Sequence, residues 1–281
     1  MVTRSKYGEL EVQAARSVLM ELVHLLGEYR DDLVLVGGWV PYFLIPNKTK
    51  PHIGSTDVDL AVNHRRIKAD VYKTIQALLL SRGYRQGLQP FIFIRTVEVR
   101  GKKVNVEVDF MAGEYEGTGT THRTQQVQRE FRARKARGCD LAFQMSREIA
   151  IKGVLPDGSL DSMAVRVASI VPFLVMKGMA IDRRLKEKDA YDIFYCIKNY
   201  PGGTDALIVD FMPHMEHGLV REGLQKIARH FSSIRNLGPR YVVDFEELTA
   251  EEEREHLARD AYERVRDFLE KLGIVQKDQV G

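Results

Sequence analysis

The pattern of hydrophobic and polar positions divides the chain into two halves of different character. Before residue 168, short apolar runs of strand length alternate with helical patterns, whereas from residue 169 onward the patterned segments repeat at helical spacing. Residues 9–29 carry apolar side chains three and four positions apart, which is typical of an amphipathic helix. We therefore predict an α+β chain, with an α/β domain over 1–168 and a helical domain over 169–281.

The first half is expected to contain a short strand, a glycine turn and a helix, followed by a second strand. The apolar run at 33–36 ends at Gly37-Gly38, and the stretch after it has Pro41 where the first turn of a helix would be. The second strand is expected at 54–62, and another helix at 66–81.

A hairpin is predicted further along this half. Residues 91–99 and 102–110 are rich in β-branched and aromatic side chains and meet at Arg100-Gly101, a plausible turn. The segments 140–155 and 162–168 also have an extended character and are separated by a Pro-Asp-Gly turn. Together these segments predict a mixed sheet.

The second half is expected to be helical. Pro-Gly-Gly at 201–203 and Asn-Leu-Gly-Pro at 236–239 interrupt its apolar pattern. The predicted helices cover 171–184, 187–200, 218–233 and 250–272.

Composition narrows the class of protein only slightly. The 281 residues are 44% hydrophobic and 29% charged with a formal net charge of +3, which is ordinary for a soluble protein. No apolar run reaches the roughly 20 residues that span a bilayer, and the N-terminus is too polar for a signal peptide. We expect a cytoplasmic protein without membrane contact. Cys139 and Cys196 stand apart from any metal-binding spacing and are interpreted as packing residues.

Charge is concentrated in one segment, RTQQVQREFRARKAR at 123–137, which holds six basic residues and one acid. Such a segment could follow a nucleic-acid backbone, because each phosphate contact adds affinity. The alternative is a solvated loop or helix face. The candidate RNA contacts are Arg129, Arg132, Arg134, Lys135 and Arg137.

Two carboxylates interrupt the second predicted strand. Asp57 and Asp59 are one residue apart, so in a strand both side chains emerge on the same face. Their repulsion requires a cation, either a metal ion or a neighbouring arginine. A third acid on an adjacent strand would complete a metal site, and Asp109 is the first choice, with Glu107 as the alternative because it shares the same face.

Small residues precede these acids. Gly37-Gly38 offers backbone N–H groups to an anion, and Gly54-Ser55 offers a hydroxyl and a second close approach of the backbone. Mg²⁺ prefers oxygen ligands and commonly links a carboxylate pair to substrate phosphates. The combination predicts a nucleoside triphosphate site that holds Mg²⁺ or Mn²⁺.

These residues resemble the nucleotidyltransferases of the DNA polymerase β superfamily, whose signature is a GG or GS turn followed by a strand with two aspartates in hDhD spacing. The match comprises Gly37-Gly38, Gly54-Ser55 and Asp57-Val58-Asp59. The helical half is similar to the AbiEii/MenT toxin branch, of type IV toxin–antitoxin systems. The segments that carry this likeness are FLVMKGMA at 173–180 and KDAYD at 188–192.

The resemblance implies a polymerase-β-like fold and NMP transfer from NTP to an acceptor hydroxyl, here the 3′ end of tRNA, with a cognate antitoxin as partner. It implies that NTP lies in a cleft between the two domains, bound by Gly38, Gly54, Ser55 and Lys177. Asp57, Asp59, Lys177 and Asp192 would be the catalytic residues. Asp57, Asp59 and Asp109 would hold the metal, although the third acid is variable in this branch.

Other interpretations remain open at this point. Asp189 could share the role of Asp192, or both acids could simply pair with Arg183, Arg184 or Lys188 across helical turns. The acceptor could instead be a small molecule or a protein, and a relative that only binds nucleotide or RNA is a further alternative.

Overall fold

The computed structural model describes residues 2–46, 49–67, 74–114 and 123–276. Its contacts divide the chain into two compact units. The first, here called the sheet unit, comprises Tyr7–Phe43 and Ile53–Ser169; the second, the helical unit, comprises Met1–Lys6, Leu44–His52 and Ile170–Gly281. The main division thus falls at 169/170, next to the boundary predicted at 168/169, but two short N-terminal segments group with the helices.

The sheet unit is built on a mixed sheet of nine strands in the described residues. Seven of them follow the order β3-β4-β5-β2-β1-β9-β8, while β7 pairs with β5 beside this path and β6 pairs with β7. β2 runs parallel to β5 and antiparallel to β1, and β1 runs parallel to β9. The prediction of a mixed sheet is therefore confirmed. The strands are β1 (Leu33–Val36), β2 (Asp57–Val62), β3 (Arg85–Gln86), β4 (Ile92–Val99), β5 (Lys102–Ala112), β6 (Thr124–Gln128), β7 (Phe131–Lys135), β8 (Ser146–Val154) and β9 (Leu160–Ala168).

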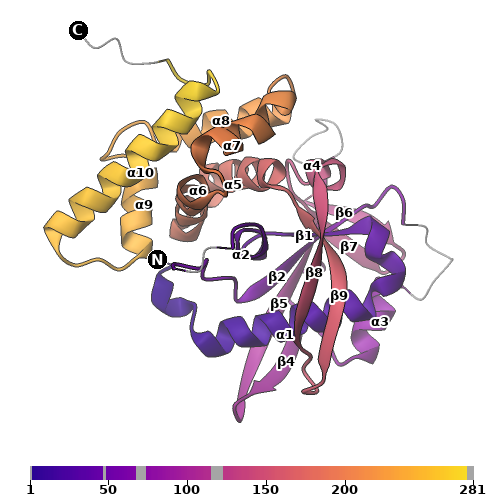
Figure 1. The fold of residues 1–281 in the computed structure, drawn as a ribbon. Coiled ribbons are helices and arrows are strands. Elements are labelled where there is room, and N and C mark those ends of the chain that lie inside the picture. Colours follow the sequence, from indigo (N-terminus) through magenta and orange to yellow (C-terminus); the bar gives the residue numbers. More distant parts are fainter. Residues whose placement is uncertain (1, 47–48, 68–73, 115–122, 277–281) are drawn as a thin grey trace, which may run out of the picture. The chain divides into compact units, whose positions relative to one another are not determined.

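Helices of the sheet unit follow the predicted pattern only in part. Helix α1 (Glu9–Leu25) buries the apolar stripe that predicted it, and Figure 1 shows it running across the strands. It is followed by the 3₁₀ turn η2 (Gly27–Asp32), and α2 (Trp39–Leu44) begins directly after the glycine pair. Of the helix predicted at 66–81, α3 (Ile75–Ser81) is present, residues 66–67 are not helical, and 68–73 lie outside the described residues.

Alternation on β5 produces the core of this unit. Val106, Val108 and Phe110 are fully buried, while the residues between them face the other side of the sheet. Phe110 packs edge to face against Phe93 and Phe131, at ring distances of 5.9 and 5.0 Å. The hairpin predicted at Arg100-Gly101 is confirmed, and both of these residues have positive φ, as a tight two-residue turn requires.

Two expectations about the first half are wrong. The basic segment 123–137 is neither a loop nor a helix face but the β6–β7 hairpin, because Phe131 and Ala133 alternate with the arginines and are fully buried. The stretch 140–155 is not extended throughout, since it begins with the short helix α4 (Asp140–Gln144), whose Leu141 and Ala142 are buried.

Among its described residues, the helical unit contains the four predicted α-helices and two further ones, α7 and α9, together with two short 3₁₀ segments. The additional helices are short, and α9 begins at its capping residue Asn236, with Pro239 in the first turn, where proline is tolerated. A Cβ on Gly178 would lie 2.2 Å from the carbonyl oxygen of Gly223, so α5 and α8 cross at very close range beside Lys177. The helices are η1 (Arg4–Lys6), α5 (Ile170–Arg184), α6 (Glu187–Asn199), α7 (Gly203–Phe211), η3 (Met212–His214), α8 (Gly218–His230), α9 (Leu237–Phe245) and α10 (Glu251–Lys271).

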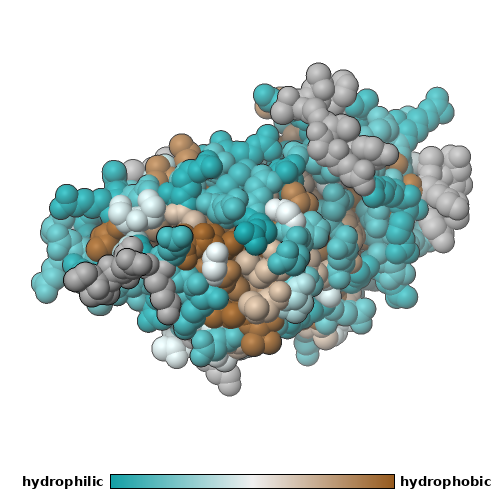
Figure 2. All heavy atoms as spheres, turned by 90° about the horizontal axis from the view of Figure 1, so that it is seen from above, coloured by the Kyte–Doolittle hydropathy of each residue, from teal (hydrophilic) through white to brown (hydrophobic). Residues whose placement is uncertain are grey.

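The surface in Figure 2 is largely hydrophilic, with a smaller hydrophobic area within it. Among the described residues, no helix has both the length and the apolar composition that crossing a membrane would demand. Cys139 and Cys196 are free and buried, as the packing interpretation expects.

Candidate active site

The acids of β2 face the acids of β5 across the sheet. Asp57 is in register with Glu107, and Asp59 with Asp109, so the four side chains project from the same face in two opposed pairs. Neighbouring strands are about 4.8 Å apart, and like charges directly opposite one another are destabilising. The sheet unit therefore concentrates negative charge on one patch of one face.

A glycine turn closes one side of this patch. Gly37 has φ +71°, and a Cβ added to it would lie 1.9 Å from a carboxylate oxygen of Asp59. A Cβ on Gly38 would lie 2.7 Å from Oγ of Ser55. Glycine is required at both positions because the backbone passes directly against the polar groups. The turn thus brings main-chain atoms as close to Asp59 and Ser55 as packing permits.

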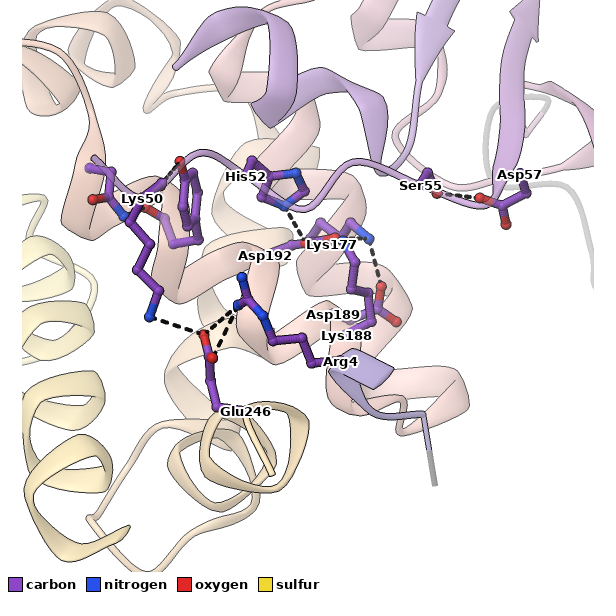
Figure 3. A network of polar contacts seen from close by, with 12 residues as sticks. Arg4, Lys50, His52, Ser55, Asp57, Lys177, Lys188, Asp189, Asp192 and Glu246 are labelled. Carbon is purple, nitrogen blue, oxygen red and sulfur yellow. Dashed lines mark hydrogen bonds and ion pairs between the residues drawn. The ribbon is translucent and has the colours of Figure 1, made fainter. Parts of the chain in front are cut away.

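Asp57 is fixed by two neighbours. The buried Ser55 donates a hydrogen bond from its hydroxyl to Oδ1 of Asp57, visible in Figure 3. Trp39 donates from Nε1 to the backbone carbonyl of Asp57 at 2.8 Å and is itself fully buried. Trp39 was not predicted as a site residue, because an indole in an apolar run gives no sign of this hydrogen bond. It anchors the start of β2.

Asp109 has a different environment from the β2 acids. Its Oδ2 accepts hydrogen bonds from Nε and Nη2 of Arg134 at 3.0 and 2.7 Å. Within the described residues, no group of three or more His, Cys, Asp or Glu side chains is placed to hold a metal ion. The structure therefore does not assemble Asp57, Asp59 and Asp109 into a three-carboxylate site, since an arginine already neutralises Asp109.

The basic residues of the β6–β7 hairpin fall into two groups, those paired with acids and those exposed to solvent. Arg134 points to Asp109, and Arg137 pairs with Glu114 at 3.3 Å. Arg129 and Arg132 are exposed, whereas Lys135 is half-buried. Of the predicted RNA contacts, Arg129 and Arg132 therefore lie on open surface, while Arg134 and Arg137 are engaged with acids of their own unit.

In the helical unit, the predicted residues Lys177 and Asp192 are in direct contact. Nζ of Lys177 lies 2.8 Å from Oδ1 of Asp189 and 2.7 Å from Oδ2 of Asp192. Arg184 donates two hydrogen bonds to Asp189, at 2.7 and 2.8 Å. Both carboxylates are fully buried, so this cluster is part of the interior of the unit (Figure 3).

Two residues absent from the prediction complete the cluster. Oδ1 of Asp192 is contacted by Nζ of Lys188 and by Nε2 of His52 at 2.9 Å, and the side chain of His52 has no exposed surface. The His52 ring also packs on Tyr191 and Tyr195, at 5.7 and 4.8 Å. No local sequence signal could have identified His52, because its partner is 140 residues away along the chain.

Burial and charge set the protonation of the cluster. Burial would raise the pKa of Asp192, but Lys177 and Lys188 outweigh it and hold that pKa well below its usual value. Burial would lower the pKa of Lys177, yet Asp189 and Asp192 raise it above the usual range. Burial lowers the pKa of Lys188, and although Asp192 opposes this effect, the neighbouring charge of Lys177 helps to keep that pKa lowered.

His52 is neutral in this setting. Burial, and next the charge of Lys188, lower its pKa to about 4. A carboxylate can only accept hydrogen bonds, so the proton of the neutral ring must be on Nε2 and must point to Asp192. Each oxygen of Asp192 thus has a cationic partner, and Oδ1 has a neutral donor in addition. In this arrangement Asp192 positions lysines rather than accepting a proton itself.

No protein-family model and no curated protein matches the chain. Among solved structures, it is similar to the crystal structure of JHP933 from Helicobacter pylori, with 11% sequence identity, coverage of 95% of this chain and 94% of that chain, and a TM-score of 0.49. By its own strands and helices, the chain is an α+β protein with a mixed sheet and a helical C-terminal region.

Proposed function

We propose that the chain is a Mg²⁺-dependent nucleotidyltransferase with a polymerase-β-like sheet, which transfers NMP from NTP to an acceptor hydroxyl. The observation that carries the proposal is the pair of opposed acids, Asp57 with Glu107 and Asp59 with Asp109, beside a glycine turn pressed against Asp59. Carboxylate oxygens gathered on one face beside a glycine turn suit a hard divalent cation together with a phosphate.

The donors on this face fit a hard divalent cation. Asp57 and Asp59 supply carboxylate oxygens, which Mg²⁺ and Mn²⁺ favour, and the described residues place no competing thiolate or imidazole in a metal-binding group with them. When bound, the ion would neutralise charge on the phosphates and favour ionisation of the attacking hydroxyl. Asp109 is left out of the proposed ligand set because its Oδ2 already accepts two hydrogen bonds from Arg134.

The remaining groups act on the triphosphate. The main chain at Gly38, Gly54 and Ser55 orients the phosphates, while the Ser55 hydroxyl donates its hydrogen bond to Asp57. Lys177, which the resemblance implies would stabilise the leaving pyrophosphate, directs two of its three N–H donors to Asp189 and Asp192. Attack by the acceptor oxygen on the α-phosphorus breaks its bond to the bridging oxygen and releases pyrophosphate.

For the acceptor, we propose the 3′ end of tRNA, as in a toxin-type enzyme. Support comes from Arg129 and Arg132, which are exposed on the β6–β7 hairpin and can contact phosphates. Arg134 and Arg137, in contrast, would first have to release the acids with which they are paired. A cognate antitoxin protein would then be the natural partner of such an enzyme.

The test is transfer of label from each α-³²P-labelled NTP to total tRNA with Mg²⁺. Label on tRNA, abolished by Asp57→Asn and retained by the exposed-acid control Glu98→Gln, is the expected result. Replacing Arg129 and Arg132 by glutamate should reduce labelling while leaving NTP binding unchanged. Label on a small molecule or on protein would show that this molecule, and not tRNA, is the acceptor. NTP binding without any transfer would contradict the proposal that the chain is an enzyme.

A further inference from the structure

Strand β8 forms one edge of the sheet. In the part of the chain that the structure describes, its only neighbour is β9, with which it pairs over all nine of its residues. One face of β8 is covered by α1: Ile151 is 4% exposed, and a Cβ on Gly153 would lie 3.1 Å from Met20. The β8–β9 ribbon is among the longest in the sheet (Figure 1). A long edge strand is a ready template for another strand.

The backbone groups that face the free edge can be assigned. Met145 accepts from the N–H of Ser169, and the N–H of Leu155 donates to Ser159, so odd-numbered residues at both ends of β8 direct their backbone toward β9. Backbone direction alternates along a strand, so the even-numbered residues point outward. A hydrogen bond of 2.9 Å from Arg16 to the carbonyl of Lys152 agrees with this assignment.

The sequence of β8 complements itself. In an antiparallel pairing of two copies centred on Ala150, Glu148 of each copy lies opposite Lys152 of the other, and Ile149 lies opposite Ile151. Glu148, Ala150 and Lys152 are exposed and direct their backbone groups to the free edge, so the centring also produces hydrogen-bonded pairs. Moving the centre by one residue removes both charge pairs.

We propose that the β8 edge is an interface between two copies of this chain, which pair β8 with β8 antiparallel about Ala150. The exposure of Val154 and Leu160 supports this proposal, because these apolar side chains are 47% and 71% exposed. They pair with each other in register at the tip of the β8–β9 hairpin, on the same side as Glu148 and Lys152. Arg16 must release the Lys152 carbonyl, and a single strand pair is a small contact, so the dimer is weak and concentration-dependent.

Sedimentation equilibrium of the whole chain, from about 1 to 200 μM, tests this proposal in the range expected for small transient interfaces. The wild type should show a monomer–dimer equilibrium. Lys152→Glu places like charges opposite each other and should weaken association about tenfold, because two favourable cross-strand pairs become unfavourable. Ala150→Pro should abolish association, since it removes an N–H at the free edge while leaving the bonds to β9 intact.

A charge exchange supplies the decisive control. The double variant Glu148→Lys with Lys152→Glu restores opposite charges only between copies, so it should recover dimerisation that the single variant lost. Thermal unfolding should show that all three variants remain folded. A wild type that is monomeric throughout the range would overturn the proposal, as would a dimer indifferent to both Lys152→Glu and Ala150→Pro.

Discussion

Two clusters of charge in this molecule differ in how they are balanced. In the sheet unit, Asp57 and Asp59 face Glu107 and Asp109, and Arg134 forms an ion pair with Asp109 at the margin of the group. In the helical unit, Asp189 and Asp192 are surrounded by Lys177, Lys188 and Arg184 and are fully buried. The first cluster brings four acids together on one face of a sheet, whereas in the second the acids and bases are buried against one another.

This difference separates residues that act on a ligand from residues that hold other residues. A carboxylate whose oxygens are all directed to internal cations cannot leave them without a large penalty, because an unpaired buried charge is costly. The acids of β2 lie beside a glycine turn, and carboxylate oxygens are the ligands that a hard divalent cation prefers. In the proposed function, β2 therefore supplies the ligand-binding acids, and α6 supplies acids that hold neighbouring lysines in place.

The largest effect is expected at β2. Replacing Asp59 by asparagine should lower the NMP transfer rate at least about a thousandfold, or about 4 kcal/mol, because the carboxylate is assigned to the catalytic cation. The fold should survive, since the change relieves like-charge repulsion. Steady-state transfer assays with unfolding curves as control would measure both; an active Asp59→Asn enzyme would refute the assignment.

The next effect concerns the closed cluster. Asp192→Asn should destabilise the protein by about 3 kcal/mol, because it removes the buried carboxylate that both Lys177 and Lys188 contact. Lys188→Met is the matched control and should cost much less, because Asp192 keeps Lys177 and His52. Urea unfolding with constant m-values would compare the two. Equal losses would show that the cluster does not depend on Asp192 as its centre.

A pH dependence should follow from His52. Its pKa is about 4 in the folded protein and 6.5 without the protein environment. Below pH 6.5 the unfolded chain therefore binds a proton that the folded chain refuses, so stability is complete above 6.5 and falls as the pH drops toward 4. Between pH 7.5 and 5 the loss should be about 2 kcal/mol.

His52→Gln keeps a donor near Asp192 but cannot titrate, so its unfolding free energy should lack this part of the pH slope. Unfolding curves of both proteins at a series of pH values provide the measurement. Parallel slopes for wild type and variant would exclude His52 as the source.

The smallest effect distinguishes two arginines of one strand. Arg134→Gln should reduce stability by about 1 kcal/mol, because it leaves the half-buried Asp109 facing Asp59 without its counter-ion. Arg132→Gln, two residues away and exposed, should change stability by less than about 0.5 kcal/mol. Thermal unfolding of the two variants would measure this difference. A larger loss of stability for Arg132→Gln than for Arg134→Gln would contradict the prediction.

Much of this fold could be read from local pattern, and the failures have identifiable causes. The β4–β5 hairpin and helix α1 carry regular apolar spacing over long stretches. The β6–β7 hairpin was missed because its strands are only five residues long and the arginines between Phe131 and Lys135 hide the alternation. Helix α9 was missed because Gly238 and Pro239 resemble a loop.

The candidate site was predictable to the extent that its geometry is local. Asp57 and Asp59 share a face because of strand alternation, and the register then adds Glu107 and Asp109. Contacts between distant segments, such as His52 with Asp192 and Arg134 with Asp109, depend on tertiary packing and leave no mark on the sequence around either partner.

The central claim is that the acids of β2 bind a divalent cation while the α6 cluster does not. Titration with Mn²⁺, followed by the electron paramagnetic resonance signal of the free ion in the presence of a non-hydrolysable NTP, tests it most directly. We expect wild type and Lys188→Met to bind Mn²⁺ alike, and the double variant Asp57→Asn with Asp59→Asn to bind none. Equal Mn²⁺ binding by the double variant, or none by the wild type, would contradict the account.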